Sequence, residues 1–147
     1  MIEEFLEDIC AGLQTMLPQL VRCELHAGRF DLEELKMIAT RTPAVFVGWL
    51  GGPVGDPQGG SIDVELNLVA YVVTGGSGGT ARNSEAGAIV ETMIRNVPGR
   101  QWGHDDDASP AGNLVCENMY NGKIGRHGVA LWAVAWRQEA RLNCNCN

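Results

Sequence analysis

Long apolar runs are missing from this sequence of 147 residues. No stretch reaches the roughly 18 to 20 apolar residues that a membrane-spanning helix needs. The acidic start, Met1-Ile2-Glu3-Glu4, lacks the positive charge of a secretory signal, so we expect synthesis and folding in the cytoplasm. The cysteines form no pair of CxxC motifs, and a zinc site of that type is therefore not predicted.

Positive charge is also scarce. The chain has 11 Lys+Arg against 18 Asp+Glu, a formal net charge of −7 and a pI of about 4.8. A protein that binds nucleic acid tightly usually presents a basic face to the phosphates, whereas the basic residues here are scattered along the chain. The composition argues against specific DNA binding, but it is compatible with an acidic channel that DNA passes without sticking.

Motifs for catalysis are weak or absent. The run Gly76-Ser77-Gly78-Gly79-Thr80-Ala81 fits the dinucleotide fingerprint G-x-G-x-x-[GA] between an expected strand and an expected helix. It lacks the Lys-Ser/Thr ending of a phosphate-binding loop, and no parallel βαβ unit is expected after it. His104 with Asp105–Asp107 could hold a divalent cation, yet the spacing matches no EF-hand. No G-x-S-x-G motif accompanies the histidines, so we predict no enzyme, no cofactor and no metal.

Hydrophobic periodicity predicts the fold class. Helices are expected at 2–17 and 83–97, the second capped by Asn83 or Ser84, with a short helix starting at Asp31. Strands are expected at 20–27, 43–50, 62–73, 114–120 and 128–142. Hairpin-length links between strands predict one α+β domain over 1–142, a mostly antiparallel sheet with helices packed on one face. Residues 143–147 are expected to form a separate tail that contains cysteine.

Two segments are apolar on both faces of their strands, Leu68–Val73 and Val129–Trp136. We take them as candidates for the centre of the sheet. Either the domain's own helices or another subunit would cover them.

Residues 51–60 contain five glycines and two prolines, a composition that predicts a flexible loop at the tip of a β-hairpin. A free loop of this kind becomes ordered only at an entropic cost, which a specific partner has to offset. The alternative is a loop without any partner. The candidate contacts between subunits are Gly51, Gly52, Pro53, Val54, Gly55, Asp56, Pro57 and Gln58.

Five cysteines leave at least one without a partner inside the chain. Cys10, Cys23 and Cys116 fall on an expected helix or strand and are predicted to be buried free thiols. Cys144 and Cys146 lie on a polar tail, so they are candidates for a disulfide with a neighbouring subunit in an oxidising environment. An inert tail and metal binding by the lone Cys-x-Cys are the alternatives.

The order of these elements resembles the Mu-like family of phage tail terminator proteins, whose small α+β fold is similar to that of the phage lambda tail terminator. The likeness covers nearly the whole chain. The residues that carry it are Ile2-Glu3-Glu4-Phe5-Leu6-Glu7-Asp8-Ile9, the strands Pro43–Trp49 and Ile62–Val73, and the closing Trp132-Ala133-Val134-Ala135-Trp136. The glycine-rich runs and the Asn-Cys-Asn-Cys-Asn tail depart from the family pattern.

The resemblance implies a structural virion protein of a contractile-tailed phage, located in the tail or neck and assembled in the host cytoplasm. Its subunits would form a homo-hexameric ring that ends the growth of the tail tube and sheath and joins the tail to the head connector. The expected partners are therefore itself, the tube and sheath proteins and the connector or neck proteins. DNA would pass through the lumen without specific binding, and no membrane would be involved.

Three alternatives stand beside this interpretation. The first is another head–tail joining or neck protein of similar size. The second is a small cofactor-binding enzyme that uses Gly76–Ala81. The third is a cytoplasmic adaptor with a binding groove.

Overall fold

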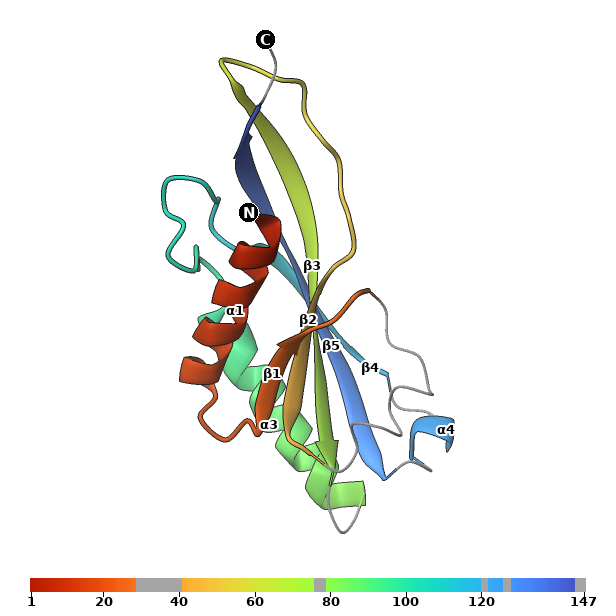
Figure 1. Cartoon of the computed structure of the whole chain (residues 1–147). Helices are drawn as coiled ribbons and strands as arrows, with labels where there is room; N and C mark the ends of the chain where they lie inside the picture. The colour runs from red at the N-terminus through yellow and green to blue at the C-terminus, as the bar shows by residue number, and fades with distance from the viewer. Residues whose placement is uncertain (29–40, 76–78, 120–121, 126–127, 145–147) are drawn as a thin grey trace.

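The computed structural model describes residues 1–28, 41–75, 79–119, 122–125 and 128–144 (Figure 1). The helices and strands follow one another as α1 (Ile2–Met16), β1 (Arg22–Leu25), β2 (Ala44–Trp49), β3 (Ser61–Gly75), α3 (Gly79–Asn96), β4 (Gly112–Asn118), α4 (Gly122–Gly125) and β5 (Val129–Asn143). The short helix expected at Asp31 lies outside the described residues.

The five strands form one sheet in the order β1-β2-β3-β5-β4. β1 and β2 are parallel, and the other neighbours are antiparallel. β3 and β5 pair over fifteen residues each, from Ser61 opposite Asn143 to Gly75 opposite Val129. Figure 1 shows this pair running the length of the molecule, with one end reaching beyond the helices. The predicted α+β class, with a mostly antiparallel sheet in a single domain, is confirmed.

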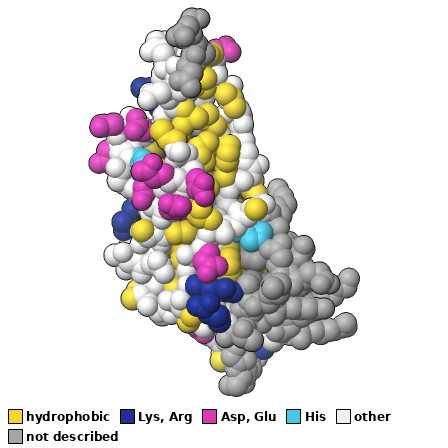
Figure 2. Space-filling view, viewed as in Figure 1, with side chains coloured by type: hydrophobic (Ala, Val, Ile, Leu, Met, Phe, Trp, Pro, Cys, Tyr) yellow, Lys and Arg dark blue, Asp and Glu magenta, His cyan; other side chains and the backbone are white. Residues whose placement is uncertain are grey.

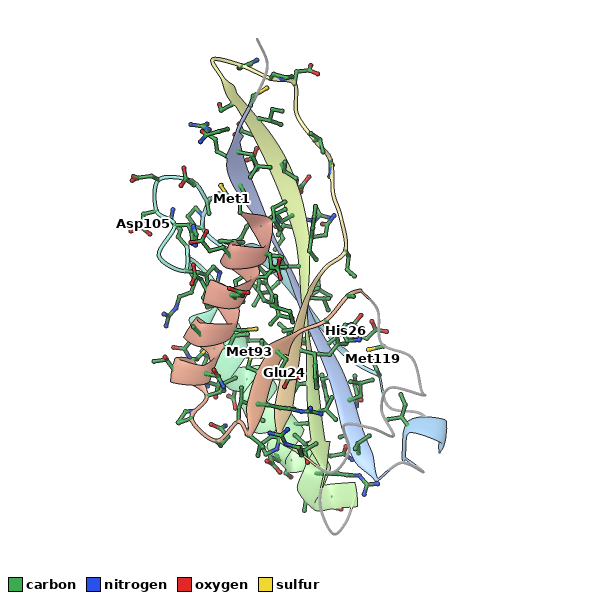
Figure 3. All side chains as sticks on the ribbon, viewed as in Figure 1. Met1, Glu24, His26, Met93, Asp105 and Met119 are labelled. Atoms are coloured by element: carbon green, nitrogen blue, oxygen red, sulfur yellow. The ribbon has the colours of Figure 1, made fainter. Side chains whose placement is uncertain are left out.

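Both long helices pack on the same face of the sheet. α1 buries the apolar stripe that its sequence predicts, including Phe5, Ile9 and Leu13, and Leu17 just beyond its end is also buried. α3 buries Ile89 and Met93. Figure 3 places Met93 between the helices and the sheet. Within the described part of the chain, no helix combines the length and apolar character that crossing a membrane requires.

The start of α3 differs from the prediction. The helix begins at Gly79, so Asn83 and Ser84 lie inside it and do not cap it. The Thr74 hydroxyl, at the end of β3, donates a hydrogen bond of 2.6 Å to the Arg82 carbonyl. This contact ties the first turns of α3 to the sheet, which the local capping pattern alone could not reveal.

The core has two parts, one on each face of the sheet. The larger cluster lies under α1 and α3. The smaller one lies on the opposite face and contains Ala44, Phe46, Val69, Tyr71, Val73, Ile124, Val129 and Leu131. Leu68–Val73 lies on β3, the middle strand, and Val129–Trp136 lies on its interior neighbour β5; both segments contribute to both clusters. Their predicted place at the centre of the sheet is therefore confirmed.

Candidate docking surface

Half of the β3–β5 pair extends beyond the part of the sheet that has a core cluster on each face. This half, named the arm, comprises Ser61–Asn67 of β3 and Arg137–Asn143 of β5. Side chains alternate between the two faces of a strand. On one face the arm carries apolar residues such as Val64 and Leu66, which belong to the larger core cluster. On the other face it carries charged residues.

The segment 51–58 follows the edge of β3. Backbone hydrogen bonds join the Asn67 N–H to the Gly51 carbonyl at 3.0 Å, and the Glu65 N–H to the Pro53 carbonyl at 2.9 Å. Val54 also forms an isolated bridge with Val64. The segment has no regular strand, as predicted, and it connects the antiparallel strands β2 and β3 of a hairpin. It is an extended segment held against β3 along its length.

Glycine makes this close pairing feasible. A Cβ atom on Gly52 would lie 1.8 Å from the Glu65 carbonyl oxygen, so no other residue fits without moving the backbone. At the far end Gly59 and Gly60 have φ values of 59° and 83°. They form a tight two-residue turn between Gln58 and Ser61, which exchange backbone hydrogen bonds of 2.8 and 3.1 Å. The same glycine content that predicts flexibility therefore also permits tight packing.

A second segment follows the other edge of the arm. The Ser109 N–H donates to the Glu139 carbonyl at 2.8 Å, and the Arg141 N–H donates to the Asp107 carbonyl at 2.7 Å. Ala108 bridges Ala140 between these two contacts. Both edges of the β3–β5 pair in the arm are thus already occupied by the protein's own backbone.

One buried amide fixes this second segment. The side chain of Gln138 is 2% exposed, and its Oε1 accepts hydrogen bonds from the Trp102 and Trp136 indole N–H groups at 2.9 and 3.0 Å. Its Nε2 donates to the Arg100 and Ser109 carbonyls at 3.0 and 2.7 Å. The amide therefore uses both of its donors and accepts two bonds, as a buried polar group requires.

The loop that carries Trp102 also docks on α1. Trp102 has a φ of 57°, and its ring occupies the space beside Gly12, where a Cβ would come within 2.6 Å of the ring. His104 Nε2 lies 2.6 Å from Asp8 Oδ2, and its ring stands edge-on to Phe5 with centroids 5.1 Å apart. These contacts hold the loop on the helix and so position the second wall of the arm.

Between the two edge segments lies an open groove of about 840 Å³ on the charged face of the arm. Segment 53–58 forms one wall, and segment 109–113 forms the other. The floor is formed by the two strands and includes Ser61, Asp63, Glu65, Arg137, Glu139 and Arg141. A bulge interrupts the pairing of β4 with β5 between Gly112 and Val115, where the second wall joins β4.

A second hollow of about 340 Å³ adjoins this groove and shares Asn113 and Arg137 with it. It contains Leu50, Ala135 and Val115. Val54 in the first wall is 67% exposed and Val115 is 65% exposed, higher than any other large apolar side chain among the described residues. Val54 pairs with Val64, and Val115 lines only the second hollow.

Charges on the floor are only partly paired. Arg141 Nε lies 3.0 Å from Asp63 Oδ1, and this hydrogen bond raises the pKa of Arg141. Arg137 Nη1 lies 3.9 Å from Glu65 Oε1. Glu139 forms no ion pair with a described residue, although it lies directly opposite Glu65 across the two strands. Like charges in that position repel each other.

The predicted contact residues are largely part of this surface. Pro53, Val54, Gly55, Asp56 and Gln58 line the groove. Gly51 and Gly52 lie where the segment joins β3.

Only one of the two cysteines of the predicted tail disulfide, Cys144, is among the described residues. The backbone N–H of Cys144 donates to the Gly60 carbonyl at 2.7 Å, which places the start of the tail at the tip of the arm. Cys144 forms a disulfide within the chain, and Cys146 lies outside the described residues. A crosslink between subunits would have to replace that bond, and it stays a prediction.

The other three cysteines differ from one another. Cys10 is buried in α1, and Cys23 of β1 is half-buried beneath it. The Cys23 thiol hydrogen-bonds to Cys10, and this bond together with burial raises the pKa of Cys23. Cys116 is exposed, so its predicted burial was wrong, because β4 is an edge strand with little covering it.

The described residues form no cofactor or metal site around the motifs considered in the sequence. Gly79, Thr80 and Ala81 belong to the first turn of α3, while residues 76–78 lie outside the description. β3 has antiparallel neighbours on both sides, unlike the strand before a dinucleotide fingerprint. The part of the chain that the structure describes contains no group of three or more His, Cys, Asp or Glu residues arranged to hold a metal ion.

The acidic loop borders the groove, because Asp106 and Asp107 line a hollow of about 210 Å³ together with floor residues such as Asp63 and Arg141. Asp105, Asp106 and Asp107 are exposed, and Figure 3 shows Asp105 projecting from the loop beside α1. In Figure 2 acidic side chains gather over α1 and this loop, around a histidine. This acidic area therefore continues to the edge of the groove through Asp106 and Asp107.

Sequence reasoning missed the second wall and the floor of the groove. The alternation of Asp63, Glu65 and Asn67, and the charges at Arg137, Glu139 and Arg141, already indicated one wet face on each strand. The missing information was the register that brings the two sets together.

A comparison with protein-family models and with curated proteins finds no match to this chain. The docking surface is therefore interpreted from its own geometry.

Proposed function

We propose that this protein is the tail terminator of a contractile-tailed phage. In this proposal its subunits form a ring that ends the tail tube and sheath and joins the tail to the head connector. The observation that carries the proposal is the arm, which projects from the α+β domain and presents a preformed groove between two fixed walls. A preformed surface avoids most of the ordering cost that a flexible loop would add to binding.

The edges of the arm suit a subunit that ends a polymer. A strand with a free edge offers unpaired N–H and C=O groups, which invite a further strand. In the arm, residues 51–58 and 107–109 already pair with β3 and β5. Contacts made by this arm therefore depend on side chains, and the arm gives little backbone template for continued addition.

Ring closure needs a different surface. A ring requires that one patch of a subunit fit another patch of the next subunit, repeated around an axis. β1 and β4 are the two outer strands of the sheet, and β4 carries the exposed Val115 and Cys116. We assign the contact between neighbouring ring subunits to these edges, which leaves the arm for other proteins.

The decisive experiment inactivates the gene for this chain in a phage that encodes it and examines the lysate by electron microscopy. A terminator is expected to leave tails of uncontrolled length without heads, and plasmid-borne expression should restore tails of normal length. A head–tail joining protein, the second candidate, would leave unjoined tails of normal length. Normal joined particles would refute both assignments.

The purified protein provides an independent check. Native mass spectrometry and negative-stain imaging should show a ring of six subunits with a central hole, alone or on the ends of added tail tubes. A monomer that never associates, even with tubes present, would count against the proposal. Calorimetric titration with nucleotides tests the enzyme alternative, which needs saturable binding.

A further inference from the structure

We infer that the apolar face of the arm, near its tip, binds an amphipathic helix of a partner protein that carries Lys or Arg beside its apolar stripe. The inference deepens the proposed function. It rests on that function only where it takes the partner to be a protein of the tail or of the head connector.

The binding area lies on the face of the arm that also carries α1. We name it the tip patch, and it consists of Met1, Ile2, Val54, Ile62 and Leu142. Met1 and Ile2 line a narrow hollow together with Leu142, and Leu142 lies directly opposite Ile62 in the strand register. Val54 pairs with the next residue of β3 on the same face. The patch therefore runs without a break from the start of α1 to segment 51–58.

The protein's own core leaves the tip patch incompletely covered. Ala140, one row nearer the helices, is 7% exposed, whereas Ile62 and Leu142 are only partly buried. Met1 and Val54, on either side of them, are 57% and 67% exposed. Figure 2 shows apolar side chains continuing along this face of the arm beyond α1. Apolar surface that is continuous with the core and open to solvent is typical of a binding site.

The edges of the arm favour a helix as the occupant. Residues 51–58 and 107–109 already pair with β3 and β5, so an extended segment would find the edges of these strands occupied. A helix satisfies its own backbone groups and needs only side-chain contacts. The four segments, about 4.8 Å apart, present a face about 14 Å wide, on which a helix about 10–12 Å across fits. α1 and α3 already pack on this face of the sheet.

Acidic side chains beside the tip patch favour a basic flank on that helix. Asp107 lines the hollow between the start of α1 and β5, and the described residues that line this hollow include no Lys or Arg. Asp106 is exposed on the same loop, and Glu3 and Glu4 are exposed in the first turn of α1. Figure 2 shows acidic side chains gathered next to the apolar band. Basic side chains beside the apolar stripe of a partner helix would therefore meet carboxylates, and acidic ones would be repelled.

A second copy of this chain is a poor occupant. The apolar stripes of α1 and α3 are already buried against the sheet, and α4 has only four residues. Ile94 is exposed on α3, but a single residue makes no stripe. None of the described helices therefore offers a free apolar face to the tip patch of a neighbour. The partner is a different protein.

The inference is tested with the full-length protein and a fluorescently labelled peptide of three Leu-Lys-Ala-Leu-Lys-Ala-Lys repeats, followed by fluorescence anisotropy at low salt. These residues favour a helix, on which the leucines form one stripe with lysines at its sides. We expect saturable binding that weakens as salt is added. A peptide with Glu in place of Lys, and one with Pro in place of Ala that cannot form a helix, should bind at least about tenfold more weakly. Equal binding of all three peptides would contradict the inference.

Methyl shifts locate the peptide on the wild-type protein, without any substitution. With the methyl groups of Ile, Leu and Val labelled for NMR, the Lys peptide should shift the signals of Val54, Ile62 and Leu142. The signal of Val115, which lines the second hollow, should stay in place. Shifts at Val115 without shifts at Ile62 would put the peptide elsewhere and overturn the inference.

Variants test the apolar contacts. Val54→Thr with Ile62→Thr should weaken the Lys peptide about tenfold, because two apolar contacts are lost while threonine keeps its preference for strands. The matched control is Val21→Thr with Val115→Thr, which changes two exposed valines outside the tip patch and should leave the affinity unchanged. Circular dichroism checks that each variant is folded. Equal losses in the two variants would refute a role of the tip patch.

A second pair of variants tests the acidic border. Asp106→Asn with Asp107→Asn should reduce both the affinity for the Lys peptide and its salt dependence. Glu117→Gln with Glu139→Gln removes two exposed acids from β4 and β5, outside the loop, and should change neither. The same loss in both variants would indicate general attraction to an acidic protein and would contradict the basic flank.

The outcomes separate this inference from the proposed function. If rings form and tails end normally but the Lys peptide does not bind the tip patch, the inference is wrong and the terminator assignment stands. If the peptide binds there but gene inactivation leaves tails normal, the terminator assignment fails and the tip patch stands. If Val54→Thr with Ile62→Thr dissociates purified rings, the occupant is a second copy, which also contradicts the inference.

Discussion

The two faces of the arm are formed by the same two strands, yet one face is apolar and buried and the other is charged and open. On the covered face, Val64, Leu66 and Ala140 are buried in the larger core cluster, next to the loop that Gln138 holds. On the open face, Glu65 and Glu139 face each other in a groove that no described element covers.

Because side chains alternate between the two faces, each position of these strands contributes either to the stability of the fold or to the groove. Residues that point to the covered face determine stability, because their removal leaves cavities or unpaired polar groups. Residues that point to the groove can be changed at little cost to folding, because their charges are solvated. Substitutions on the two faces should therefore have separable effects.

The largest effect is expected on the covered face, at Gln138. Gln138→Leu removes four hydrogen bonds and leaves the Trp102 and Trp136 indole N–H groups without their acceptor. Each buried polar group left unpaired costs about 1–3 kcal/mol, so we expect the free energy of unfolding to fall by about 3–5 kcal/mol. Urea denaturation followed by tryptophan fluorescence measures this loss.

The matched control is Gln14→Leu, the same change at an exposed position of α1. It should alter the free energy of unfolding by no more than about 0.5 kcal/mol. Similar losses in both variants would mean that Gln138 does not organise the covered face.

An intermediate effect is expected at the wall of the groove. Gly52→Ala places a Cβ 1.8 Å from the Glu65 carbonyl oxygen, so segment 51–58 must move away from β3. We expect a loss of about 1–3 kcal/mol, as for other overpacked sites, and faster hydrogen exchange at the Glu65 and Asn67 amides. Hydrogen–deuterium exchange resolved to individual residues measures the second effect.

Gly112→Ala serves as the control, since it lies in the same groove and its added Cβ meets no atom within 4 Å. Its exchange pattern should match that of the wild type. If Gly52→Ala also leaves the Glu65 amide protected, the wall is not held by close backbone packing.

Much of the fold was readable because buried residues repeat with the period of their element. The stripe through Phe5, Ile9 and Leu13 predicted α1 to within one residue of its end, and the apolar segments at Leu68–Val73 and Val129–Trp136 predicted the sheet centre. These signals are local, and tertiary packing reinforced them. The start of α3 was missed because the Thr74–Arg82 contact that accompanies it is not local.

The candidate site was less accessible to sequence reasoning. Composition predicted a contact role for 51–58, but glycine predicts flexibility and close backbone packing equally well. The close approach of Gly52 to Glu65 shows the second in this structure. The groove itself depends on the register of Asp63 with Arg141 and of Glu65 with Glu139. That register joins positions more than seventy residues apart, so periodicity within each strand could not supply it.

The last prediction leaves stability unchanged and measures how well covered and uncovered thiols are protected. Cys23 lies beneath α1 with its pKa raised by the hydrogen bond to Cys10 and by burial, whereas Cys116 is exposed on edge strand β4. Only the thiolate reacts with iodoacetamide, so at about pH 8 we expect Cys116 to react at least about a hundredfold faster than Cys23. A raised folded-state pKa means that the folded protein keeps this proton, so raising the pH should not bring Cys23 level with Cys116 while the fold persists. Peptide mapping by mass spectrometry assigns each rate to its cysteine, and Cys116→Ser should leave the slow rate of Cys23 unchanged. Rapid labelling of Cys23 in the folded protein would show that α1 does not cover β1 as described.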